Sequence, residues 1–112
     1  MAKRADILVA RRRLGFGAEG RREHFLVVQS DLLAGIETVV VAPLDDDQPM
    51  YDGDPLAVHV SSKEAGTKGG QVVLVHLLVA APLSKFELAS AGRLLPKSMA
   101  QVDDAMRTVL HL

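Results

Sequence analysis

The stretch that decides the fold is FLVVQSDLLAGIETVVVAPL, residues 25–44 of a chain of 112 residues. Its two ends, 25–33 and 39–44, carry runs of consecutive apolar residues rather than an apolar residue at every second position. A strand that is continuously apolar is buried on both faces, whereas a strand with one exposed face alternates. A small barrel rarely covers both faces of two such strands, so we expect a second copy of the chain to cover one of them, in a homodimer.

Short apolar runs separated by turn residues continue this pattern on either side. We expect strands over residues 6–11, 24–30, 38–44, 56–60 and 71–79, joined by loops that hold most of the glycines. From Pro96 onward, apolar residues recur every three or four positions, which is typical of a helix with one apolar face. A strongly curved sheet is the cover that the chain offers for this face. The sequence therefore predicts a mainly β fold, a small antiparallel barrel with a carboxy-terminal helix, as a single domain over residues 1–112.

Composition excludes several classes of protein. The chain has no Cys, which excludes disulfides, thiol catalysis and cysteine-ligated zinc. Its four histidines lack paired ligand spacing, the acidic loop 45–54 lacks the spacing of a calcium loop, and the glycine pattern at 15–20 does not precede a helix. We therefore expect no metal and no cofactor. The longest strongly apolar stretch is shorter than the roughly 20 residues that cross a bilayer, so we expect a cytoplasmic protein without a membrane partner.

Charge is balanced in total but not along the chain. Residues 1–22 hold seven Lys or Arg against two acids, whereas residues 23–54 hold eight acids and no Lys or Arg. The basic end suits a nucleic acid or an acidic partner, or it forms a solvated hairpin that faces its acidic neighbour. Aromatic residues make up 4% of the chain, and nucleic-acid grooves usually add stacking rings to charge, so composition favours the hairpin.

Residues 25–44 resemble the second and third strands of CcdB-type toxins, through V-Q-S-D-L-L followed by V-x-P-L. Residues 56–60 and 79–82 are similar to the next strand and turn of that family. The ends are more similar to the sister family of MazF and PemK: residues 4–7 resemble its opening R-G-D-I strand, and residues 92–96 its G-R-L-S-P helix entry. Both families are toxins of type II toxin–antitoxin systems. The resemblance implies an SH3-like barrel with a carboxy-terminal helix, acting as a homodimer that a small antitoxin neutralises.

CcdB-like proteins poison DNA gyrase, and this is the first function that the resemblance implies. The mechanism is wedging of the helix end into a protein interface, without bond chemistry. The residues of this chain that would contact gyrase lie at the helix end: Met106, Val109, Leu110, His111 and Leu112. Helical spacing also suits the first three of them to the core, which leaves His111 and Leu112 as the informative pair.

MazF-like proteins cut single-stranded RNA, and this activity is the alternative. They use an arginine before the second strand and a threonine or serine after the third, positions that fall here on Glu23 and Asp45. A ribonuclease would then need a rebuilt site, in which a histidine acts as general base and an arginine stabilises the phosphorane-like charge. The residues available for that site are Arg21, Arg22, His24 and His76. A third hypothesis is a toxin fold that has lost its activity and survives as an antitoxin-binding partner.

The antitoxin is expected to be a partly disordered acidic segment that wraps around the dimer. We expect it to contact the basic residues near the amino terminus, namely Arg11, Arg12, Arg13, Arg21 and Arg22.

Overall fold

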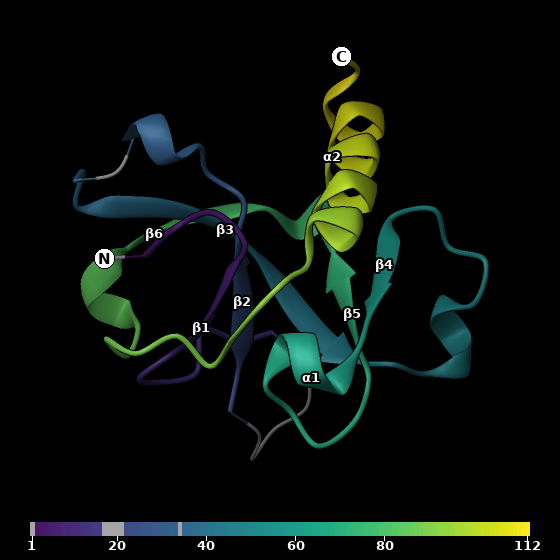
Figure 1. Cartoon of the computed structure of the whole chain (residues 1–112), viewed down its shortest axis with the longest axis horizontal. Coiled ribbons are helices and arrows are strands. Elements are labelled where there is room, and N and C mark those ends of the chain that lie inside the picture. Colours follow the sequence, from purple (N-terminus) through teal and green to yellow (C-terminus); the bar gives the residue numbers. More distant parts are fainter. Residues whose placement is uncertain (1, 17–21, 34) are drawn as a thin grey trace.

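The computed structural model describes residues 2–16, 22–33 and 35–112, and Figure 1 shows a curled sheet with one long helix beside it. No helix in these described ranges is long and apolar enough to cross a membrane. The strands and α-helices, in chain order, are β1 (Asp6–Val9), β2 (His24–Val27), β3 (Thr38–Asp46), β4 (Ala57–Val60), α1 (Ser62–Ala65), β5 (Gln71–Leu74), β6 (Val79–Pro82), β7 (Gly92–Arg93) and α2 (Pro96–Leu110). Single 3-10 turns connect them at η1 (Asp31–Leu33), η2 (Pro49–Tyr51), η3 (Val75–Leu77) and η4 (Leu83–Lys85).

The long strand β3 organises the sheet. It pairs with β2 along one edge, while β6 and β5 share its other edge in turn. The path of hydrogen-bonded strands runs β4-β5-β3-β2-β1-β7, and every pair is antiparallel. This antiparallel half-barrel with a carboxy-terminal helix confirms the predicted fold class.

The predicted strand over 71–79 is wrong in one respect, because η3 divides it into β5 and β6. The pairs Val41↔Val79 and Leu44↔Val73 show the reason. Between these pairs β3 advances by three residues while the opposite chain advances by six, so three residues have no place in the ladder. They form the single turn of η3, which lies between the part of the chain that pairs with β3 as β5 and the part that pairs with it as β6.

Both faces of β2 and β3 are buried within one chain. On one face, α2 places Met99 and Val102 over Leu26 in one apolar cluster. On the other face, Phe25 and Phe86 belong to a second cluster, with their ring centroids 5.5 Å apart. The continuous apolar pattern therefore does not require a second copy of the chain, contrary to the argument from sequence, and the homodimer stays a prediction.

A buried carboxylate joins α1 to α2. Glu64 forms a capping box with Ser61, the N-cap residue of α1, and its Oε2 accepts the backbone N–H of Leu95 at 3.0 Å. Burial by itself would raise the pKa of Glu64, but hydrogen bonds from Ser98, Leu95 and Ser61 outweigh it and hold that pKa below its usual value.

This carboxylate predicts a loss of stability in acid. A lowered pKa in the folded state means that Glu64 stabilises the fold fully above about pH 4.5, and that this contribution disappears as pH falls through the folded pKa. We expect Glu64→Gln to lower the free energy of unfolding by about 1.5–3 kcal/mol at pH 7, because charged hydrogen bonds are lost. Urea unfolding at pH 7, 5, 4 and 3 should show the wild type converging on the variant in acid. A constant difference at all four pH values would contradict this role.

Candidate functional site

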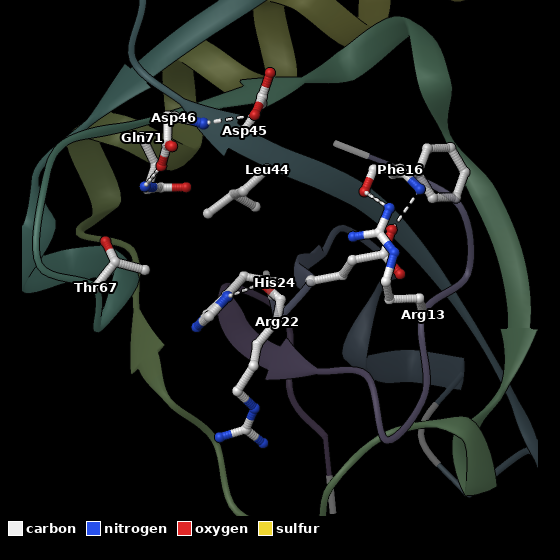
Figure 2. A pocket seen from close by; sticks show the side chains of 10 residues that line it. Arg13, Phe16, Arg22, His24, Leu44, Asp45, Asp46, Thr67 and Gln71 are labelled. Atoms are coloured by element: carbon white, nitrogen blue, oxygen red, sulfur yellow. Dashed lines mark hydrogen bonds between the residues drawn. The ribbon is translucent and has the colours of Figure 1, made fainter. Parts of the chain in front are cut away.

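A hollow forms where the loop after β1, the start of β2, the end of β3 and the start of β5 meet (Figure 2). The pairs Val9↔His24 and Asp46↔Gln71 bring these elements together. The hollow holds about 40 Å³ and opens beside a groove of about 470 Å³, with Arg22, His24 and Thr67 lining both. Sites for small ligands usually measure about 300–1,000 Å³, so the groove has room for a nucleotide and the hollow alone does not. The remaining lining residues are Arg13, Phe16, Glu23, Leu44, Asp45, Asp46 and Gln71 in the hollow, and Gly66 and Lys68 in the groove.

His24 is the first residue of β2, and its ring lies in the middle of this site (Figure 2). Its Nδ1 is 3.2 Å from the backbone carbonyl oxygen of Arg22. Because a carbonyl oxygen can only accept, this contact calls for a proton on Nδ1, and in the neutral imidazole the lone pair is then on Nε2. A neutral imidazole in this tautomer has the form that a general base needs.

Two arginines border the site. Arg13 donates from Nη2 to the carbonyl oxygen of Phe16 at 3.4 Å. The guanidinium of Arg22 forms an ion pair with Glu87. Figure 2 shows this guanidinium directed away from Leu44, which also lines the hollow.

Glu23 stands where the family resemblance expects an arginine, and the structure gives it a different role. Its side chain is 6% exposed, and its carboxylate accepts the backbone N–H groups of Leu14 and Phe16. The carboxylate therefore fixes the first part of the loop between β1 and β2.

Asp45 stands at the threonine or serine position and is also engaged within the chain. Its Oδ2 accepts from the Tyr51 hydroxyl at 2.6 Å and from Gln48, and its Oδ1 accepts the backbone N–H of Asp46 at 2.8 Å. The hydrogen bond from Tyr51 to Asp45 is the main cause that raises the pKa of that phenol to about 12, with help from burial and the nearby negative charges. Asp45 thus connects the end of β3 to η2.

The structure brings together two of the four residues predicted for a ribonuclease site. Arg22 and His24 line the same groove, whereas Arg21 lies outside the described residues. The structure does not bring His76 to them, because β5 brings its first residue, Gln71, to the hollow and His76 follows the other end of that strand, in η3. The sequence argument missed Thr67 and Lys68, since their place depends on how the loop after α1 returns to β5.

Helical spacing predicts that Met106, Val109 and Leu110 suit the core. Met106 and Val109 do pack against it, but Leu110 is more than half exposed, and His111 and Leu112 are exposed as well. His111 ends the helix in a left-handed conformation and donates its backbone N–H to the last turn.

The basic segment meets its acidic neighbour at the hollow, which Arg13 lines together with Asp45 and Asp46, while two of its ion pairs lead elsewhere. Arg4 pairs with Asp103 of α2 and Arg22 with Glu87, both outside residues 23–54. Residues Arg11, Arg12 and Arg13 are exposed.

Within the described ranges, one group of side chains has the composition of a metal site. Ligand atoms of Asp47, Asp52 and His59 lie within 4.8 Å of one another. All three are exposed, and a contact of 3.2 Å between His59 Nδ1 and the Asp47 carboxylate accounts for the approach of two of them.

The fold and the site define a small half-barrel protein with a charged groove beside β2. Residues 3–110 match the family model of PemK-like, MazF-like toxins of type II toxin–antitoxin systems. The chain therefore belongs to this family, and the similarity of residues 25–44 to CcdB lies within a chain of the PemK and MazF type. It matches no curated protein.

Solved structures with the same fold cover nearly the whole chain. A mycobacterial endoribonuclease in complex with its cognate antitoxin is 17% identical with a TM-score of 0.78, over 100% of this chain and 97% of that one. The toxin MazF-mt6 of Mycobacterium tuberculosis is 18% identical with a TM-score of 0.75, over 96% and 97%. A MazE-MazF structure from Deinococcus radiodurans is 18% identical with a TM-score of 0.76, over 99% and 97%. At these identities the likeness shows the fold.

Proposed function

We propose that this toxin is an endoribonuclease that cuts single-stranded RNA in the groove beside β2. The observation that carries the proposal is the His24 imidazole, which lines the groove together with Arg22 and whose Nδ1 contacts a backbone carbonyl oxygen. His24 would remove the proton from a ribose 2′-hydroxyl, and the 2′-oxygen would attack the adjacent phosphorus. Arg22 would stabilise the charge on the phosphate oxygens as the 5′-oxygen leaves and takes a proton from solvent.

Two further observations support this proposal. Acids occupy the family's arginine and threonine positions, but both have partners within the chain. Glu23 accepts backbone N–H groups and Asp45 accepts from Tyr51, so these interactions account for both carboxylates without a role in binding RNA. Among the proteins of the same fold, one described as an endoribonuclease covers the full length of this chain.

The test is cleavage of a mixed-sequence single-stranded RNA by the purified chain. We expect products with a 5′-hydroxyl, and a loss of at least about tenfold in rate for Arg22→Ala, because one charge-stabilising group is removed. Arg12→Ala is the matched control, since Arg12 is exposed and lines neither the hollow nor the groove. The control should stay within twofold of the wild type. Equal losses in both variants would contradict a specific role for Arg22.

The same preparation tests the two other hypotheses from sequence. Trapped gyrase cleavage complexes without RNA cleavage would favour wedging by the exposed helix end, Leu110 to Leu112. A folded protein without either activity would favour the inactive toxin. The family match to MazF-like toxins rather than to CcdB favours RNA as the target.

The antitoxin surface stays part of the proposal. Arg11, Arg12 and Arg13 are exposed, so an acidic antitoxin segment can reach them. Antitoxin binding that is insensitive to salt would contradict this placement.

A further inference from the structure

The guanidinium that the proposed reaction needs is paired with a carboxylate of the same chain. Arg22 pairs with Glu87, and both side chains are well hydrated, 63% and 41% exposed. Glu87 lines neither the hollow nor the groove. In this arrangement the guanidinium of Arg22, which lines the groove, extends away from Leu44 (Figure 2), and a phosphate beside His24 would compete with Glu87 for it.

The position of Glu87 is determined by the sheet. Its backbone N–H donates to the carbonyl oxygen of Val9 at 2.8 Å, and the preceding Phe86 bridges to Ala10. Phe86 itself is buried against Phe25. These contacts hold Glu87 along one edge of β1.

Arg22 is held near the other edge of the same strand end. Val9 pairs with His24 across β1 and β2, and Arg22 precedes His24 by two residues. The ion pair therefore spans the end of β1, between Glu87, which donates to Val9, and Arg22, whose neighbour Glu23 accepts the backbone N–H of Ala10.

We infer that Glu87 competes with substrate phosphate for Arg22 and keeps its guanidinium away from the hollow until RNA displaces the carboxylate. The inference rests on the proposed function, because it concerns the same groove. A phosphodiester carries one negative charge, as the Glu87 carboxylate does, so the exchange leaves the charge next to Arg22 unchanged. The RNA adds contacts to Lys68 and Thr67 in the groove, while the released Glu87 remains hydrated.

Glu87→Gln should therefore tighten RNA binding through Arg22. The probe is a fluorescent mixed-sequence single-stranded RNA in which every ribose is 2′-O-methylated, so that it cannot be cleaved, measured by anisotropy at 50 mM salt. We expect about threefold to fivefold tighter binding for Glu87→Gln, the upper part of the range measured for exposed ion pairs. Glu37→Gln removes the same charge from an exposed residue in the turn before β3, at the opposite end of that strand from Asp45, and should change binding by less than twofold.

The double variant tests whether the gain passes through Arg22. With Arg22→Ala already present, adding Glu87→Gln should give no further gain. A gain that persists without Arg22, or an equal gain from Glu37→Gln, would overturn the inference, because it would reflect net charge alone.

Cleavage measured in parallel separates this inference from the proposed function. RNA cleavage with no effect of Glu87→Gln on binding would overturn the competition and leave the ribonuclease intact. No cleavage, together with a gain in binding that requires Arg22, would overturn the ribonuclease and support the competition. No binding by any variant at 50 mM salt would count against both.

Discussion

Replacing His24 with glutamine is expected to lower the rate of RNA cleavage by about 10²- to 10⁴-fold, the usual contribution of a general base. The glutamine side chain is polar and of similar size, and its amide nitrogen takes the place of Nε2 rather than of Nδ1, which contacts the carbonyl oxygen of Arg22 at 3.2 Å. This amide has no basic nitrogen, so the 2′-hydroxyl proton has no acceptor of suitable strength. The change therefore removes the base at the position where it would act.

The matched control for this prediction is the same substitution at the other histidine that the sequence offered. His76 is exposed in η3, beyond the far end of β5, so His76→Gln should leave the rate within twofold of the wild type. Single-turnover cleavage of the same RNA measures both variants, and thermal unfolding verifies that both are folded. A larger loss for His76→Gln than for His24→Gln would overturn the assignment of the base.

Local sequence pattern was enough to predict most of the elements. The helix from Pro96 and the starts of β1, β2 and β3 appear where apolar spacing and turn residues place them. The break at η3 could not be predicted in this way. It arises because two stretches of different length must span the same part of β3, and this mismatch exists only once the register is set.

The source of burial on the second face of the sheet was also hidden in the sequence. An apolar run such as 25–28 predicts that both faces of the strand are buried, but it does not identify the segments that cover them. The cover turned out to be α2 on one face and the segment around Phe86 on the other. In that segment Phe86 stands between Lys85 and Glu87 without a continuous apolar run, which is too weak a pattern to mark it as part of the core.

Sequence proximity explains which part of the site could be foreseen. Arg22 and His24 are adjacent to the family's arginine position, so a resemblance in β2 was sufficient to select them. Thr67 and Lys68 come from a loop with no apolar pattern, and only the pairing of β5 with β3 carries it to the groove. The role of Glu23 as a loop anchor depends on two backbone N–H groups, which no residue pattern reveals.

Gly66→Ala is expected to cost about 3 kcal/mol or more in the free energy of unfolding, a large part of the 5–15 kcal/mol typical of a domain. Gly66 ends α1 with a φ of 71°, and a Cβ built there would lie 2.0 Å from the carbonyl oxygen of Ala91. The approach is reciprocal, since a Cβ on Gly92 would lie 2.2 Å from the carbonyl oxygen of Glu64. The backbones of α1 and of the segment entering β7 therefore touch, and a methyl group must push them apart.

That separation would also reach α2 and the groove. Moving α1 away from β7 strains the hydrogen bond from Leu95 to Glu64, which fixes the start of α2, and displaces the loop that carries Thr67. Gly53→Ala is the matched control, because Gly53 has a similar φ of 76° but nothing lies within 4 Å of its added Cβ. It should show only the backbone cost of about 1–2 kcal/mol. Urea unfolding measures the loss of unfolding free energy in both variants, and the difference between the two losses is the cost of the contact with Ala91. Equal losses would mean that the two backbones can separate without cost.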